Sequence, residues 1–284
     1  MDRNRIVDYI LLSRPYTIPG IALVAILANV FVRGNLVLDY STVIDIIFAL
    51  VIWLLVVYLS ESFHKHAERP KVPIAVPAAF FVIALIISII VNYFTVLFLV
   101  LALIAAIVYS SKSIGWFGSS FVFIFRGGIE LAIFLSIILF HSANITNEAL
   151  VVGIMLLLIT DSRNLIGDIR DVLSDKYTFP KKYGNTISYV VSFIFTLIVI
   201  VLTPSLYISI PLIAILLLLI LSRSAYLLHH LFVVTTVFYL LNYISYLLSF
   251  DLFLTNVAYI SVLLTFTYKF VNRPSNPIDK QVHY

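Results

Sequence analysis

The sequence predicts an all-α fold: a polytopic transmembrane helical bundle that forms a single domain over residues 1–284. Three observations support this prediction. Hydrophobic residues make up 62% of the chain and charged residues 11%, with a mean hydropathy of +1.10, whereas soluble domains are about half apolar and about a quarter charged. Apolar runs of about 20 residues, the length that crosses a bilayer as a helix, recur along the chain. Basic residues gather in alternate loops.

Ten apolar runs are long enough to span the hydrocarbon core. Each is expected to be helical, because a lone strand would leave its backbone groups unsatisfied in lipid. The joins near 92–94, 203–205 and 250–252 are so short that they require tight hairpins. The expected spans are 16–33, 42–60, 73–92, 94–110, 121–141, 147–163, 186–203, 205–222, 229–250 and 252–271.

The distribution of Lys and Arg predicts the topology. These residues occur before the first span, after the second, fourth, sixth and eighth spans, and after the last, which marks the cytoplasmic loops. Ten spans then place both termini in the cytoplasm, whereas nine would place the C-terminal segment outside. The two largest hydrophilic loops, 60–72 and 161–185, fall on the cytoplasmic side and are expected to cap the bundle. This topology explains the net charge of +4, so no nucleic acid or protein partner is implied.

The loop "DSRNLIGDIRDVLSDKYTFPKKYG", at 161–184, is unusually acidic for this chain. If 161–175 continues the sixth span as a helix, five oxygen-bearing side chains share one face, because residues three and four apart are neighbours. Close carboxylates resist ionising together unless a cation lies among them, and oxygen ligands suit Mg²⁺. An acidic but merely solvated loop is the alternative. The stripe comprises Asp161, Asn164, Asp168, Asp171 and Asp175, and the opposite, packing face comprises Leu165, Ile166, Ile169, Val172 and Leu173.

Several of these segments resemble one known family. "DIRDVLSD" followed by "TFP" and "YG" is similar to the second aspartate-rich motif of the UbiA-type intramembrane prenyltransferases. "DYILLSRPYTIPG" resembles the family's opening, and "YSSKSIGWFGSSFVFIFRGG" resembles the loop and helix after its fourth span. The resemblance implies nine family-type spans around a lipid-open cavity, with cytoplasmic loops that cap the active site. The sequence adds a predicted tenth span.

The resemblance also implies an activity: Mg²⁺-dependent transfer of a polyprenyl group from a polyprenyl diphosphate to an aromatic or lipid-precursor acceptor in the membrane. Asp168, Asp171 and Asp175 would hold Mg²⁺ against the diphosphate, with Asn164 beside them. Two other classes of function stay open at this point. One is a paralogue that binds prenyl diphosphate without turning it over, and the other is a secondary transporter whose carboxylates carry protons or ions.

Four other charged groups lie in or near the predicted spans. Lys112 and Arg126 are candidates for further phosphate contacts. Arg126 also precedes Glu130 by four residues in the fifth span, so a structural ion pair is the alternative for these two residues. Asp45, near the outer end of the second span, is expected at the membrane interface.

The chain departs from the family at the first aspartate-rich motif. The corresponding loop reads "SESFHKHAERPKVP", in which "RPKVP" is present but the aspartates are absent. Glu61, His64 and Glu68 fall at i, i+3 and i+7 and would share a helical face. Glu61 and Glu68 could then hold a second Mg²⁺, or His64 and Lys65 could meet the diphosphate. The alternatives are a loop that has lost its metal and only caps the site, and a zinc site from His64, His66 and a glutamate.

Overall fold

The computed structural model describes residues 13–63, 72–110, 121–173, 177–222 and 224–271. These residues form helices joined by short turns and contain no strand. The helices are η1 (Pro15–Thr17), α2 (Ile18–Arg33), α3 (Tyr40–Phe63), α4 (Ala75–Val91), α5 (Thr95–Ser110), α6 (Ile124–His141), α7 (Asn147–Arg170), α8 (Phe179–Tyr183), α9 (Asn185–Leu202), α10 (Leu206–Leu221), α11 (Ala225–Leu247) and α12 (Phe253–Val271).

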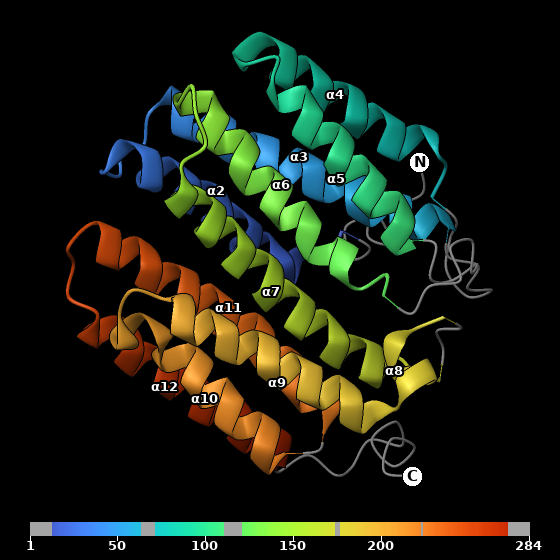
Figure 1. Ribbon diagram of the computed structural model, residues 1–284, viewed down its shortest axis with the longest axis vertical. Coiled ribbons are helices and arrows are strands. Elements are labelled where there is room, and N and C mark those ends of the chain that lie inside the picture. The colour runs from blue at the N-terminus through green and yellow to red at the C-terminus, as the bar shows by residue number, and fades with distance from the viewer. Residues whose placement is uncertain (1–12, 64–71, 111–120, 174–176, 223, 272–284) are drawn as a thin grey trace.

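The long helices run side by side along one common direction (Figure 1). The α4–α5 hairpin lies at one edge of the bundle and α10 and α12 lie at the other, with α6, α7 and α11 between them. We call the end at which α3 and α7 finish and α6 begins the site end. The short helix α8 lies at this end, against α7 and α9. The other end, with the α2–α3 and α6–α7 turns, is called the opposite end.

Each of the ten predicted spans corresponds to one long helix. Six of these helices are long and apolar enough to cross a membrane by themselves: Pro15–Arg33, Tyr40–Phe63, Ile124–His141, Asn147–Arg170, Asn185–Leu202 and Ala225–Leu247. The helices within 75–91, 95–110, 206–221 and 253–268 are apolar but shorter. The all-helical, multi-pass membrane architecture is therefore confirmed, while the number of full spans and the sidedness of the termini stay predictions.

Small residues bring α6 and α7 together at the centre of the core. A Cβ added at Gly127 would lie 2.3 Å from the carbonyl oxygen of Leu157, and one added at Gly153 would lie 2.5 Å from Cδ1 of Leu131. Neither glycine could carry a side chain without a shift of its neighbours. Such close approach is typical of helix packing in membranes, where dispersion contacts and polar contacts replace the hydrophobic effect.

The outer helices show large apolar side chains to their surroundings. Ile90 on α4, Val201 on α9, Leu221 on α10 and Leu254 on α12 are among the most exposed residues of the bundle. In water a surface this apolar would aggregate, whereas in a bilayer it contacts lipid tails that are equally apolar. The exposed faces therefore fit a membrane protein.

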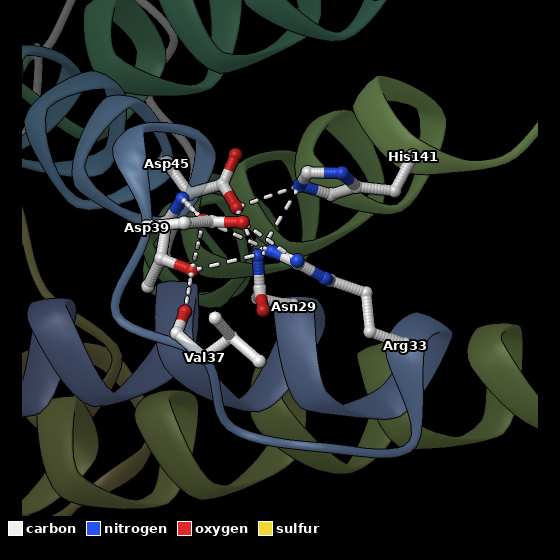
Figure 2. A network of polar contacts seen from close by, with 7 residues as sticks. Asn29, Arg33, Val37, Asp39, Asp45 and His141 are labelled. Atoms are coloured by element: carbon white, nitrogen blue, oxygen red, sulfur yellow. Dashed lines mark hydrogen bonds and ion pairs between the residues drawn. The ribbon is translucent and has the colours of Figure 1, made fainter.

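A buried polar network joins three helices at the opposite end (Figure 2). Asp45 on α3 is only 1% exposed. Its Oδ2 accepts a hydrogen bond from Nδ2 of Asn29 on α2 at 2.7 Å and lies 2.7 Å from Nε2 of His141 on α6. The structure thus buries Asp45 among three helices at this end of the bundle, and its depth in the membrane stays a prediction. Its helical position placed it near the outer end of the span, but that spacing carries no information about partners on other helices.

The same end carries an ion pair at its surface. Arg33, the last residue of α2, contacts both carboxylate oxygens of Asp39, at 2.7 and 3.1 Å. The Arg33 guanidinium and the backbone N–H of Thr42 hold the pKa of Asp39 well below its ordinary value. Arg33 and Asp39 neutralise one another, and Asp45 relies on Asn29 and His141 as its partners.

Candidate functional site

The predicted acidic stripe begins on the last turns of α7. Asp161, Asn164 and Asp168 are buried along one face of this helix, and Asp168 is only 2% exposed. The predicted helix over 161–175 is too long, because α7 ends at Arg170 and Asp171 occupies the C-cap with φ −97° and ψ 12°. The backbone N–H of Val172 then donates to Ile169 O in a tighter turn. Helical spacing therefore applies as far as Asp168.

Asp171 lies beside a basic neighbour. The Arg170 guanidinium donates two hydrogen bonds to the Asp171 carboxylate, at 2.7 and 2.6 Å. The turn also changes the expected packing face: Leu165, Ile166 and Ile169 are buried as predicted, but Leu173 is 68% exposed. The sequence pattern failed here because it assumed a helix where the chain turns.

Asp161 lies on the same face of α7 as Asn164, three residues earlier in the helix. It connects α7 to α6. Its Oδ1 accepts a hydrogen bond at 2.8 Å from the backbone N–H of Gly127, in the first turn of α6. Its Oδ2 is buried and has no hydrogen-bond partner among the described residues. The backbone of Gly127 can approach so closely only because that residue lacks a Cβ. Asp161 thus has a packing role that the helical stripe did not reveal.

Glu130 pairs with α7 and not with its own helix. Nη2 of Arg163 lies 3.1 Å from Oε1 of Glu130, and the Thr160 hydroxyl donates to Oε2 of the same carboxylate. All three side chains are buried. The alternative of an i, i+4 ion pair between Arg126 and Glu130 is therefore wrong. A facing helix offered Glu130 a closer cation than its own helix did.

Arg126 points instead toward α3 and α5. Its guanidinium carbon lies 4.2 Å from the ring centroid of Trp53 and 5.9 Å from that of Tyr109, distances at which a cation is attracted to an aromatic face. Arg126 is 4% exposed, and its Nη1 has no hydrogen-bond partner among the described residues. Nε1 of Trp53 and Nδ2 of Asn164 are also buried donors with no hydrogen-bond partner among the described residues. Buried donors without a partner are uncommon in folded proteins.

Arg14, just before the first span, places a second cationic side chain at the site end. Nη2 of Arg14 lies 3.4 Å from Oε1 of Glu61, the third-last residue of α3. Glu61 is buried beneath this guanidinium. Burial opposes the charge of Arg14, but the nearby phenols of Tyr109 and Tyr16 and the Glu61 carboxylate outweigh it and raise the pKa of Arg14. Arg14 belongs to the "SRP" segment of the sequence, yet nothing in that segment alone points to Glu61.

Five of the predicted site residues lie outside the described residues: His64, Lys65, Glu68, Lys112 and Asp175. The described residues contain no group of three or more His, Cys, Asp or Glu side chains that could hold a metal ion. Asp168 and Asp171 nevertheless supply two carboxylates near the end of α7. Mg²⁺ is usually bound through one or two carboxylates, with phosphate oxygens and water completing its shell. The α7 side of the site therefore carries carboxylates of the kind that Mg²⁺ prefers, one of them paired with Arg170, and a metal site there stays a prediction.

No protein-family model and no curated protein matches the sequence. Solved structures match the fold with probability 1.00. One is a digeranylgeranylglyceryl phosphate synthase, with a TM-score of 0.64 and 13% identity over 87% of this chain and 99% of that one. Another is a UbiA homologue from Archaeoglobus fulgidus bound to GPP and Mg²⁺, with a TM-score of 0.58 and 15% identity over 85% and 99%. A UbiA homologue from Archaeoglobus fulgidus bound to Cd²⁺ also matches, with a TM-score of 0.52.

These similarities establish the fold. The chain has the UbiA-type prenyltransferase architecture, and it spans nearly the whole of each matched structure. Identities of 12–15% carry no residue-level assignment. The roles of the site residues must therefore come from the contacts of this chain.

Proposed function

We propose that the protein transfers a polyprenyl group from a polyprenyl diphosphate to an aromatic or lipid-precursor acceptor within the membrane, with Mg²⁺ as cofactor. The observation that carries the proposal is the buried polar face at the site end of α7, where Asp161, Asn164 and Asp168 are buried along one side of the helix. The fold of the protein supports the proposal, because a structure of the same architecture binds GPP and Mg²⁺.

The carboxylates of Asp168 and Asp171 would hold Mg²⁺ against the diphosphate, together with Asp175. When bound, Mg²⁺ neutralises the negative charge that grows on the leaving diphosphate. Asn164 and Arg126 would donate hydrogen bonds to phosphate oxygens through Nδ2 and Nη1, two buried donors that lack a hydrogen-bond partner among the described residues. Such donors, fixed before the substrate arrives, stabilise developing charge with little reorganisation.

The surrounding bundle suits an allylic cation. Trp53 and Tyr109 hold the Arg126 guanidinium against their ring faces, which fixes this cation in place before a diphosphate arrives. The apolar core of α3, α5, α6 and α7 excludes water, which would otherwise capture the allylic cation. Lys112, His64 and Lys65 stay proposed phosphate contacts, on the sequence alone.

The activity can be tested with membranes that contain the protein, radiolabelled geranylgeranyl diphosphate and a panel of phenolic and glyceryl-lipid acceptors. We expect transfer to at least one acceptor, lost on chelation of Mg²⁺. Asp168→Asn should lower the rate by about 100-fold or more, the effect of removing one group that stabilises developing charge. Asp251→Asn, an exposed carboxylate before α12 at the opposite end, is the matched control and should keep the wild-type rate.

The same experiment separates the alternatives. Binding of the diphosphate with no transfer to any acceptor would support a non-catalytic paralogue. A wild-type rate for Asp168→Asn would mean that the α7 face is not the metal site.

A further inference from the structure

His229 is a titratable side chain at the site end that the proposed reaction does not yet use. It lies one turn into α11, the helix that packs against both α2 and α7. Because α2 and α7 also pack against α6, these four helices form a closed ring of contacts. The proposed phosphate donors Arg126, on α6, and Asn164, on α7, belong to the same ring of helices.

The hydrogen bond of His229 fixes which of its ring nitrogens carries a proton. Nδ1 lies 3.3 Å from the carbonyl oxygen of Arg163 on α7. A carbonyl oxygen only accepts, so Nδ1 donates, and the neutral ring then carries its lone pair on Nε2. The side chain is half-buried, and among the described residues Nε2 neither finds a hydrogen-bond partner nor is closed off from its surroundings. Nε2 is therefore a base with an available lone pair.

Gly167 makes room for this ring against α7. A Cβ added at Gly167 would lie 3.2 Å from both Nδ1 and Cε1 of His229, which is tighter than ordinary contact. Cε1 is bonded to Nε2, so the available nitrogen also lies beside α7 at this level. Asp168, the first carboxylate proposed for Mg²⁺, directly follows Gly167 in the helix. The absence of a side chain at Gly167 thus brings the base to the part of α7 that carries the proposed metal ligand.

Two cations of α7 act on the same ring. The charges of Arg163 and Arg170 influence His229, as does His230 on its own helix. Each of the two guanidinium groups is held by a carboxylate. Their contacts with those carboxylates leave Nε2 open.

We propose that His229 is the general base of the transfer reaction and that its Nε2 takes the proton that a hydroxyl acceptor loses. The proposal rests on the proposed function, since it adds a base to the same reaction. The bond between C1 of the polyprenyl group and the diphosphate oxygen breaks, and its electron pair leaves with the diphosphate. The acceptor oxygen forms the new bond to C1, and its proton passes to Nε2. A positioned base of this kind commonly contributes about 10²–10⁴-fold to a rate.

Positional isotope exchange separates ionisation of the diphosphate from proton transfer. Geranylgeranyl diphosphate labelled with ¹⁸O at the bridging oxygen is incubated with Mg²⁺ and membranes that contain the protein, without acceptor. Breaking and re-forming the C1–O bond moves the label to non-bridging positions and needs no base. Transfer is then measured with phenolic and glyceryl-lipid acceptors. His229→Asn keeps a donor for Arg163 O but has no basic nitrogen, so we expect wild-type exchange and about 100-fold slower transfer.

His230→Asn is the matched control. His230 is the next residue of α11, and its Nδ1 donates to the carbonyl oxygen of Tyr226 in its own helix at 2.8 Å. This variant should change neither exchange nor transfer. Gly167→Ala is a second test variant, because its Cβ would push the His229 ring by a few tenths of an ångström. It should slow transfer more than exchange.

The outcomes separate this inference from the proposed function. A loss of transfer alone in either test variant supports the base. A wild-type transfer rate in His229→Asn would overturn the inference and leave the proposed function standing. Equal losses of exchange and transfer in both test variants would also overturn it, because the ring would then serve folding or ionisation. If the wild type exchanged label but transferred to no hydroxyl acceptor, the base would have no proton to take and the inference would fail. If the wild type showed neither exchange nor transfer, both proposals would fail.

Discussion

Gly127→Ala should weaken the contact between α6 and α7 on which the candidate site depends. The new Cβ would lie 2.3 Å from Leu157 O and 2.7 Å from Oδ1 of Asp161, against 3.4 Å or more in ordinary contact. The two helices must therefore move apart by roughly 1 Å, and overpacking of this kind costs about 1–3 kcal/mol. Straining or losing the buried Gly127–Asp161 hydrogen bond adds about 1–3 kcal/mol.

The neighbouring glycine provides a matched control. A Cβ at Gly128 would meet nothing within 4 Å, and replacing a helical glycine by alanine favours the helix by up to about 1 kcal/mol. Thermal unfolding in detergent, followed by the loss of the monodisperse peak in size-exclusion chromatography, compares the two variants directly. Gly127→Ala should lower the midpoint by on the order of 10 °C, and Gly128→Ala should leave it unchanged or raise it slightly.

One result would contradict the close approach of α6 and α7. Equal midpoints for the two variants would mean that α6 and α7 do not approach at Gly127. Asp161 would then lose its only described partner, and the placement of the α7 face next to Arg126 would need revision.

Two further variants test the charges of the bundle. Glu130→Ala should destabilise the protein by about 3–5 kcal/mol, because Arg163 would stay buried without its carboxylate; a midpoint as high as that of the exposed control Glu148→Ala would contradict the pair. Asp39→Asn should make the free energy of unfolding depend less on pH at acidic pH. Since the pKa of Asp39 is lowered in the folded state, its contribution is complete above the unfolded pKa of about 3.9 and is lost as the pH falls below it. Unfolding midpoints measured between about pH 6 and 3 should show this difference, and parallel profiles would exclude it.

The fold could be predicted from the sequence because membrane helices are defined locally. Each apolar run had the length of a span, and each became a helix close to its expected bounds, except that α7 continues seven residues past the expected end at 163. The α7 face could be predicted for the same reason, since Asp161, Asn164 and Asp168 repeat at helical spacing. That rule stopped applying at Asp171, where the chain turns out of the helix.

The partners of the buried charges could not be predicted in this way. Glu130 pairs with Arg163 and not with Arg126. Glu61 pairs with Arg14, which lies 47 residues away in the sequence. Such choices depend on which helices face one another and at what height. One sequence contains no local pattern for either, and only the packed bundle reveals them.

The polar network at the opposite end has a consequence for biosynthesis. A polar side chain enters a membrane at lower cost when its partner enters with it. Asn29 and Asp45 are only 16 residues apart and belong to consecutive helices, so we expect the α2–α3 hairpin to insert with this hydrogen bond already made. His141 emerges from the ribosome nearly one hundred residues after Asp45. The arrival of α6 therefore completes the network and anchors the first hairpin to the centre of the bundle.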